Sequence, residues 1–238
     1  MNSSQFNKIL VVKHGSLGDI AFSILAMASI KQFFNNATID LLTEEKYVNF
    51  LSNSNYFNSI FKDNRKGIID SLKVILKINQ NKYDLIIDLQ NSKRTNNYWS
   101  FLKFISEVKV NGSRSNCDIQ YVIPPQGTES PQQGLYNQLK LLGVNEIYQN
   151  VDWLSRDITA INEDKIILMI PGVSKSGKDK QWSPDKFAIL ASTLEKKGYH
   201  ICVIGQKSDK QTVETINNAC QKVIDLSDKS PPEIIYSI

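Results

Sequence analysis

An acidic residue follows two glycines in the segment KHGSLGD, which leads from an apolar run into an amphipathic stretch. Gly15 and Gly18 flank this turn, and they allow backbone conformations and a close approach of a ligand that a Cβ would block. Asp19 has two interpretations: it stabilises the helix N-terminus through the helix dipole, or it faces a cleft and accepts a proton as a general base. The glycines form neither a P-loop nor a complete GxGxxG fingerprint, so alone they do not indicate a nucleotide site.

A second loop, PGVSKSGKDKQWSP, combines hydroxyl groups, glycines and lysines between an apolar run and a helix. Ser183 and Pro184 mark the start of that helix as its N-cap and its first residue. The hydroxyls of Ser174 and Ser176 and the ammonium groups of Lys175, Lys178 and Lys180, together with backbone N–H groups and the helix N-terminus, can neutralise a diphosphate without a metal ion. A solvated lysine-rich loop is the alternative interpretation.

The segment DLIIDLQNSKR places basic residues directly after an apolar strand. Lys93 and Arg94 fall at the start of the next helix, at the same sheet edge as Asp19, where cations would suit an acidic group of a substrate. Cations at a helix N-terminus are mildly unfavourable with the helix dipole, which favours a functional account. His14 contacts a ligand or is only solvated or hydrogen-bonded, and the sequence leaves both open.

Short apolar runs alternate with amphipathic stretches along the whole chain, as in an α/β protein whose parallel strands are buried on both faces. We expect strands at 9–13, 38–42, 84–89, 108–111 and 120–123, and a second series at 166–170, 200–204 and 223–226. We expect helices near 19–34, 44–51, 68–78, 93–105 and 133–142, and then at 184–197 and 209–220. Ligands of such sheets bind at the carboxyl ends of the strands, where the loops described above must lie.

The two series of strands and helices predict two domains with a boundary between about 145 and 164. This stretch lacks a long series of regularly spaced apolar residues, as linkers do. The 238 residues correspond to about one and a half domains of ordinary size. The second domain is therefore expected to be incomplete.

Composition excludes several classes of protein. The net charge of +4, from 28 basic and 24 acidic residues, is too small an excess for a dedicated nucleic-acid binder. The three cysteines have no metal-ligand spacing, so we expect no metal site, reduced thiols and a cytoplasmic protein.

The helix expected at 68–78 carries Lys66, Lys73 and Lys77 on one face and apolar residues largely on the other. Two interpretations are open: this helix lies against anionic lipid, or its charged face is simply solvated.

Three stretches in a fixed order span about residues 8–230: ILVVKHGSLGDI, YDLIIDLQNSKR, and PGVSKSGKDKQWSPDKFAILASTLEKKG followed by ICVIG. Together they resemble the bacterial lipopolysaccharide heptosyltransferases of glycosyltransferase family 9. The resemblance implies a GT-B fold of two facing Rossmann-like domains, with residues 1–150 on the acceptor side and 151–238 as part of the donor domain. It also implies inverting transfer of heptose from ADP-heptose, without metal or cofactor, to the lipopolysaccharide inner core at the cytoplasmic face of the inner membrane.

Residue by residue, the resemblance makes Asp19 the general base that deprotonates the acceptor hydroxyl. Lys180, with Ser174 and Ser176, would bind the donor diphosphate. Lys93 or Arg94 would bind anionic groups of the acceptor. Family members continue with a D-x-G-x-x-H loop that closes on the donor. Neither His14 nor His200 lies in such a motif, so we expect part of the donor domain to be missing.

Two other functions compete with sugar transfer. A noncatalytic remnant or carbohydrate-binding module of the same fold would keep the acceptor cleft and would not turn over an ADP-sugar. A nicotinamide-dependent Rossmann enzyme is the second alternative, and its incomplete glycine fingerprint counts against it.

Overall fold

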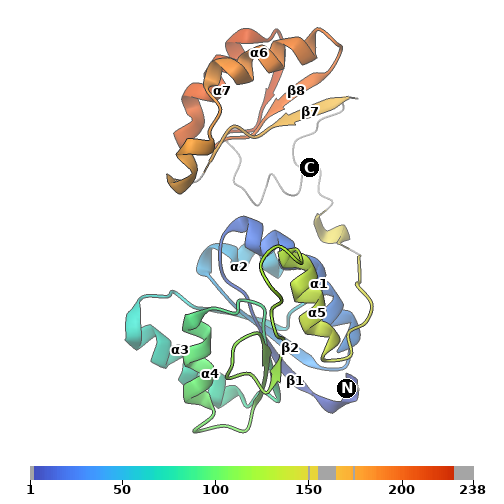
Figure 1. The fold of residues 1–238 in the computed structure, drawn as a ribbon, viewed down its shortest axis with the longest axis vertical. Coiled ribbons are helices and arrows are strands. Elements are labelled where there is room, and N and C mark those ends of the chain that lie inside the picture. The colour runs from blue at the N-terminus through green and yellow to red at the C-terminus, as the bar shows by residue number, and fades with distance from the viewer. Residues whose placement is uncertain (1–2, 150, 155–164, 174, 228–238) are drawn as a thin grey trace. The chain divides into compact units, whose positions relative to one another are not determined.

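The computed structural model describes residues 3–149, 151–154, 165–173 and 175–227 (Figure 1). The chain divides into two compact units, Met1–Trp153 and Leu154–Ile238, and each is described by itself. The division lies within the stretch 145–164 that the sequence marks as a boundary. Among the described residues, no helix is both long and apolar enough to cross a membrane.

Unit 1 is built on a parallel sheet of six strands in the order β3-β2-β1-β4-β5-β6. Its strands are β1 (Lys8–Val12), β2 (Thr38–Thr43), β3 (Ser59–Lys62), β4 (Leu85–Asp88), β5 (Lys109–Gly112) and β6 (Ile119–Gln120). The apolar runs of β1 and β4 are buried on both faces, as their lack of polar alternation predicts. The strand order reverses between β1 and β4, and ligands of doubly wound sheets bind at such a switch point.

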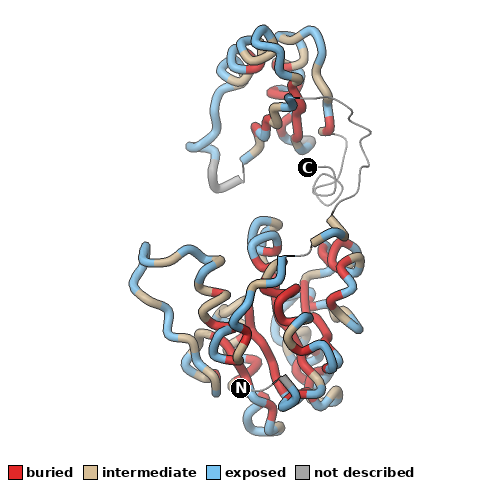
Figure 2. Tube along the Cα trace, turned by 90° about the vertical axis from the view of Figure 1, so that its right-hand side faces the viewer, coloured by how far each residue is buried: buried red, intermediate tan, exposed pale blue. Residues whose placement is uncertain are grey.

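Helices cover both faces of this sheet, which Figure 2 shows as a buried layer between more exposed segments. They are α1 (Leu17–Phe33), α2 (Glu45–Ser52), α3 (Gly67–Asn81), α4 (Lys93–Leu102) and α5 (Pro131–Lys140), with a 3-10 helix η1 at Ser3–Gln5. Helices α3 and α4 pack beside each other, and α1 packs with α5 (Figure 1). Side chains of α3 and α4, among them Val74, Ile78 and Trp99, form one core with Leu10 and Ile86 of the sheet.

Unit 2 repeats the plan on a smaller scale. Its parallel sheet has the order β7-β8-β9, with β7 (Ile166–Met169), β8 (His200–Val203) and β9 (Val223–Asp225). Helices α6 (Pro184–Glu195) and α7 (Lys210–Ala219) pack against each other, and 3-10 helices lie at Lys175–Lys180 and Lys207–Asp209. Another 3-10 helix, Asp152–Leu154, crosses the division between the two units. The core joins Met169, Ile201 and Val203 of the strands to Ala191 and Ile216 of the helices.

The α/β class and the order of elements follow the sequence prediction, with ends that differ by a few residues. The strand predicted at 120–123 is a two-residue strand at Ile119–Gln120, and the apolar Val122 and Ile123 after it are exposed. Strand β3 was not predicted, because its four residues, SIFK, are a short edge segment that is only half-buried. This omission matters for the site, because functional residues follow β3.

Candidate functional site

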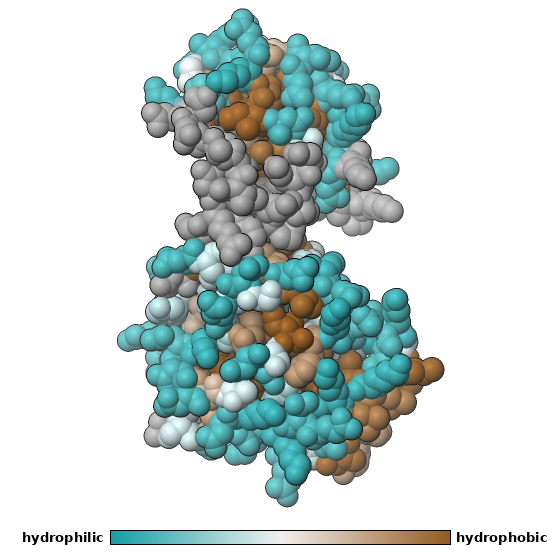
Figure 3. Space-filling model, turned by 180° about the vertical axis from the view of Figure 1, so that it is seen from behind, coloured by the Kyte–Doolittle hydropathy of each residue, from teal (hydrophilic) through white to brown (hydrophobic). Residues whose placement is uncertain are grey.

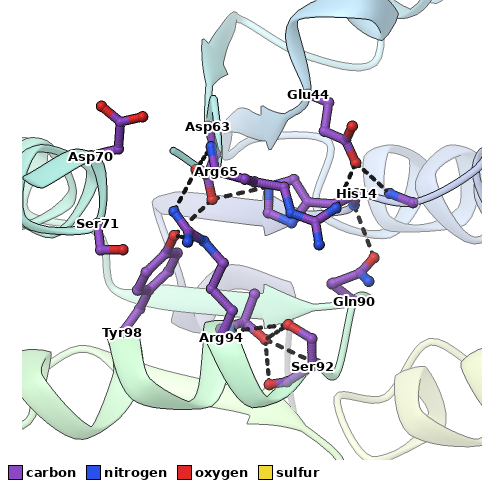
Figure 4. A network of polar contacts seen from close by, with 12 residues as sticks. His14, Glu44, Asp63, Arg65, Asp70, Ser71, Gln90, Ser92, Arg94 and Tyr98 are labelled. Carbon is purple, nitrogen blue, oxygen red and sulfur yellow. Dashed lines mark hydrogen bonds and ion pairs between the residues drawn. The ribbon is translucent and has the colours of Figure 1, made fainter. Parts of the chain in front are cut away.

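The carboxyl ends of β1, β2, β3 and β4 bring four loops together at the switch point of unit 1. Figure 4 shows the polar side chains that meet there, from the starts of α1, α2 and α4 and from the loop before α3. The sequence predicted two of these loops as sites, the one after β1 and the one after β4.

Backbone conformation and space both require a glycine at the start of the loop after β1. Gly15 has a φ of +117°, and a Cβ there would lie 2.5 Å from Oδ2 of Asp19. The Gly15 N–H donates to Oε1 of Glu44 at 3.0 Å, and the Tyr47 hydroxyl donates to the Gly15 carbonyl at 3.1 Å. Gly18 has no such constraint, since a Cβ there would meet only Oγ of Ser16, at 3.8 Å.

Asp19 is exposed and forms a capping box with Ser16 at the start of α1. Its Oδ2 accepts from the Ser16 N–H at 2.6 Å and from the Ser16 hydroxyl at 2.8 Å. Partial burial raises the pKa of Asp19, but the hydrogen bonds from Ser16 and the charge of Lys13 outweigh it, so the pKa lies below its usual value. One carboxylate oxygen is thus held in place, while no described residue donates to Oδ1. Asp19 can therefore stabilise the start of α1 through Oδ2 and still accept a proton as a general base.

Lys13 and Asp88 are buried beside this loop. The Lys13 ammonium donates to the Leu89 carbonyl at 3.2 Å, and burial lowers its pKa while Asp19 and Asp88 oppose that shift. Asp88 closes the turn after β4, where its Oδ1 accepts from the Gln90 and Asn91 N–H groups at 3.0 and 2.9 Å. Its Oδ2 accepts from Nε1 of Trp99 at 2.7 Å, so Asp88 also ties this turn to α4.

A fully buried carboxylate, Asp63, stands at the centre of a second network (Figure 4). Its Oδ1 accepts from the Arg65 N–H at 2.9 Å and from Nη2 of Arg94 at 3.2 Å, and its Oδ2 accepts from the Tyr98 hydroxyl at 2.8 Å. Arg94 also contacts the Tyr98 hydroxyl through Nε. Burial lowers the pKa of Arg94, but Asp63 and Tyr98 raise it further, so the guanidinium is held charged and oriented.

His14 is buried in the same network and is neutral. Its backbone N–H donates to Oε1 of Gln90 at 3.0 Å, while its ring Nε2 lies 3.6 Å from Oδ2 of Asp63 and has no hydrogen bond among the described residues. Burial lowers the pKa of His14 to about 4, although Asp63 opposes this, and the charges of Arg65 and Arg94 lower it further. An unpartnered imidazole nitrogen therefore lies close to two guanidinium groups.

Glu44 joins the two networks. Its Oε1 accepts both from the Gly15 N–H at 3.0 Å and from Nη1 of Arg65 at 2.9 Å. Burial raises the pKa of Glu44, but these hydrogen bonds and Lys46 lower it below its usual value. Arg65 has a positive φ of 57°, which turns the chain so that its N–H reaches Asp63.

The structure brings Asp19 and Arg94 to the same edge of the sheet, as the sequence predicts. Lys93 is exposed and has no ion pair among the described residues. The sequence prediction missed Asp63, Arg65 and Tyr98 and gave Glu44 no role. The residues Asp63 and Arg65 follow the strand that was missed, and the only available signal was the run KDNR after a short apolar segment.

The corresponding loop of unit 2 is described only in part. Ser174 lies outside the described residues, and the side chain of Ser176 is not described. Lys180 is exposed at the end of the 3-10 helix Lys175–Lys180. Ser183 is the N-cap of α6 but makes no capping hydrogen bond with its side chain, and Pro184 is the first helical residue.

Two further contacts shape this loop. A Cβ on Gly172 would lie 2.5 Å from Oδ2 of Asp209, so the backbone passes close to a carboxylate, as it does at Gly15. Trp182 packs edge-on against Phe187 of α6, with ring centroids 5.6 Å apart. Within the part of the chain that the structure describes, no cluster of three or more His, Cys, Asp or Glu side chains could hold a metal ion.

Comparison with known proteins gives consistent results. The model of glycosyltransferase family 9 (heptosyltransferase) matches residues 135–229. Lipopolysaccharide heptosyltransferase 3 of Escherichia coli K12 is 22% identical over 233 residues, which cover 86% of this chain and 65% of that protein. The crystal structure of E. coli heptosyltransferase WaaC with ADP-2-deoxy-2-fluoro heptose is similar with a TM-score of 0.72 and 15% identity, covering 95% of this chain and 78% of that one. The chain is thus similar to glycosyltransferase family 9, through the family model over residues 135–229 and through its heptosyltransferase relatives.

Like the WaaC structure, the chain has a GT-B-like fold with two Rossmann-like parallel sheets. Lipopolysaccharide heptosyltransferase 1 of Campylobacter coli is 32% identical over 87 residues, which cover 35% of this chain and 25% of that protein. The chain thus spans a quarter of one of these curated relatives and 65% of the other.

Proposed function

We propose that this chain is a family 9 glycosyltransferase that moves heptose from ADP-heptose to an acidic acceptor of the lipopolysaccharide inner core. The observation that carries the proposal is Asp19, an exposed carboxylate at the switch point of unit 1, with Oδ2 fixed by Ser16 and no described donor on Oδ1. Both curated relatives are lipopolysaccharide heptosyltransferases, and WaaC was crystallised with a fluorinated ADP-heptose. On this proposal the chain works in the cytoplasm, where the acceptor is built at the inner membrane.

Asp19 acts as the general base. It removes the proton from the acceptor hydroxyl while that oxygen attacks the anomeric carbon of the heptose. The bond between the anomeric carbon and the diphosphate oxygen breaks on the opposite face, and its electron pair leaves with ADP, so the configuration inverts. Because hydrogen bonds from Ser16 hold the pKa of Asp19 below its usual value, the carboxylate is deprotonated and oriented at neutral pH.

The departing ADP carries negative charge that the loop before α6 would neutralise. Lys180 supplies an ammonium group, Ser174 and Ser176 supply hydroxyls, and the first turn of α6 supplies backbone N–H groups. Two features support this assignment: Lys180 is exposed, and the side chain of Ser183 does not cap α6. With these groups in place, the reaction would need no metal ion.

Arg94 would bind an anionic group of the acceptor, such as a sugar carboxylate or a phosphate. Asp63 and Tyr98 use Nη2 and Nε of the guanidinium, which leaves Nη1 for a ligand. Arg65, whose Nη1 is bound to Glu44, has Nη2 for the same purpose. Lys93 is an exposed additional cation at the start of α4.

The substitution Asp19→Asn tests the assignment of the base. An amide can still accept from Ser16 but cannot take a proton, so we expect turnover with ADP-heptose to fall by about 10²–10⁴-fold while the thermal midpoint changes little. Asp70→Asn is the matched control, because Asp70 also accepts a backbone N–H at a helix start, from Lys66 at 3.0 Å, and has no hydrogen bond to Asp19 or Asp63 among the described residues. Wild-type turnover in Asp19→Asn would show that another group is the base. Bound ADP-heptose without turnover in the wild type would favour a noncatalytic module.

A further inference from the structure

Helix α3 has two apolar faces, and only one of them is in the core. Val74, Ile75 and Ile78 are buried against the sheet. A second set, spaced three or four residues apart, lies in solvent with large exposed fractions: Ile68 80%, Ile69 71%, Leu72 43% and Leu76 54%. A solvated helix face normally carries polar residues, so this stripe needs another explanation.

The apolar surface continues beyond α3. Phe101 of α4 and the two residues Phe104 and Ile105 that follow this helix are exposed, Phe104 to 88%. Helices α3 and α4 pack beside each other, and Figure 3 shows hydrophobic side chains gathered along one side of unit 1. We call this surface the α3–α4 face; it consists of Ile68, Ile69, Leu72, Leu76, Phe101, Phe104 and Ile105. Apolar patches of this kind on soluble units mark sites of interaction.

Cations border the stripe on α3. Lys66, Lys73 and Lys77 are exposed, and none has an ion pair among the residues that the structure describes. The Lys77 ammonium lies 4.1 Å from the centroid of the Phe61 ring, at the edge of the sheet. Lys103, beyond the end of α4, already pairs with Asp118 at 3.0 Å. Lysines that flank an apolar stripe on one helix fit a surface with an apolar interior and anionic head groups.

We propose that the α3–α4 face binds the surface of an anionic phospholipid bilayer. The apolar side chains enter the boundary between head groups and acyl chains, and the three lysines of α3 lie among the lipid phosphates. Helix α3 begins two residues after Arg65, and Arg94 lies in the first turn of α4, so the proposed acceptor cations lie at the starts of the two helices that carry the lipid-binding side chains. A lipid-anchored acidic acceptor would therefore be presented close to the bilayer surface.

Vesicle flotation without any sugar donor tests this proposal. We expect binding to vesicles of equal parts phosphatidylglycerol and phosphatidylethanolamine to be about tenfold or more above binding to phosphatidylcholine vesicles, and to weaken as salt rises. Leu72→Ser with Leu76→Ser should reduce binding by about tenfold or more, because both side chains lose their apolar contact. The matched control, Ile189→Ser with Leu190→Ser, removes two exposed apolar side chains from α6 and should leave binding unchanged.

The lysines have a separate test. Lys73→Gln with Lys77→Gln should weaken binding to phosphatidylglycerol vesicles by about fivefold for each charge, whereas Lys196→Gln with Lys197→Gln in unit 2 should not. Equal binding to both kinds of vesicle, or full binding by the Leu72 and Leu76 double variant, would overturn the proposal. So would a dimer in sedimentation velocity that this variant dissociates, since the face would then belong to a second copy. Heptose transfer to a water-soluble acceptor is measured separately, and its failure would count against the proposed function only.

Discussion

The loops that follow the first strand of each unit share a sequence plan, but their surroundings differ. After β1, the loop is tied to Glu44, Tyr47 and Gln90, and Asp19 and Ser16 cap α1 reciprocally. After β7, Lys178 and Lys180 are exposed, and the N-cap side chain of α6 makes no capping hydrogen bond. The proposed base is thus oriented before any ligand binds, whereas Lys180, the proposed donor-binding cation, has no ion pair among the described residues and would gain one when an anion binds.

Burial explains the difference. In unit 1, four of the five residues of β1 are buried and the sheet has helices on both faces, so charged groups at its edge are partly removed from water. In unit 2, only the last residue of β7 is buried, and β9 has no buried residue. Hydrogen bonds and ion pairs are stronger where water is excluded. The fold of unit 1 therefore supports a fixed polar network that unit 2, as described, does not.

The largest effect is expected where the network is most buried. Asp63→Asn removes the charge that pairs with Arg94, and we expect it to lower the free energy of unfolding by about 3 kcal/mol. Asp225→Asn is the counterpart in unit 2; this exposed carboxylate accepts from Asn217 and Ser227, and its loss should cost about 1 kcal/mol or less. Urea unfolding measures both, and equal losses would remove the contrast between the units.

The two glycines of KHGSLGD should respond in opposite directions. Gly15→Ala meets both a positive φ and the Asp19 carboxylate, so we expect a loss of roughly 2–3 kcal/mol in the free energy of unfolding. Gly18→Ala, in the first turn of α1 with space for a methyl group, should be neutral or stabilise by up to about 1 kcal/mol. Thermal unfolding of both variants checks the pair. A tolerated Gly15→Ala would contradict the loop geometry.

His14 should make unit 1 sensitive to acid. Its pKa is about 4 in the folded protein, below the ordinary value, so the unfolded chain takes up the proton first as the pH falls. Stability from this group is present above the ordinary histidine pKa and is lost as the pH falls toward 4. Between pH 7 and pH 5 the free energy of unfolding should fall by about 2 kcal/mol because of this group. Urea unfolding of His14→Gln, which has no imidazole, should show a pH dependence smaller by this amount; an unchanged dependence would show that the histidine is not buried and neutral.

The smallest effect compares the two helix N-caps. Ser16→Ala removes a side chain that accepts from the Asp19 N–H and donates to its carboxylate, so it should cost about 1 kcal/mol. Ser183→Ala removes a side chain without a capping bond and should cost a few tenths of a kcal/mol at most. The difference between the two midpoints in urea is the informative quantity. A larger loss at Ser183 would show that the two loops are equally organised.

Much of the fold could be predicted from the sequence, because strands buried on both faces of a parallel sheet leave continuous apolar runs such as ILVV and LIID. The helix that carries Asp19 in its first turn, and its place at the strand ends, could also be predicted, although the helix begins at Leu17 rather than at Asp19. Strand β3 could not, because SIFK is short and half-buried.

The Asp63 network could not be predicted from the sequence, for a different reason. Asp63 meets Arg94 and Tyr98 only through the crossing of the chain from β3 to α4, across about thirty residues. The burial of His14 likewise depends on side chains from other elements, so its pKa has no local signal. Pairings between distant segments are set by topology. Because the edge strand β3 was not predicted, the loop after it, which carries Asp63, was not recognised as part of the site.

The central claim is that these residues catalyse an inverting transfer of heptose, with Asp19 as the base. The most direct test is to incubate the chain, without added metal, with ADP-heptose and a water-soluble acidic acceptor, and to determine the anomeric configuration of the product by proton NMR. We predict a product whose anomeric configuration is opposite to that of the donor. A product with retained configuration, or ADP-heptose recovered without any transfer, would contradict the account.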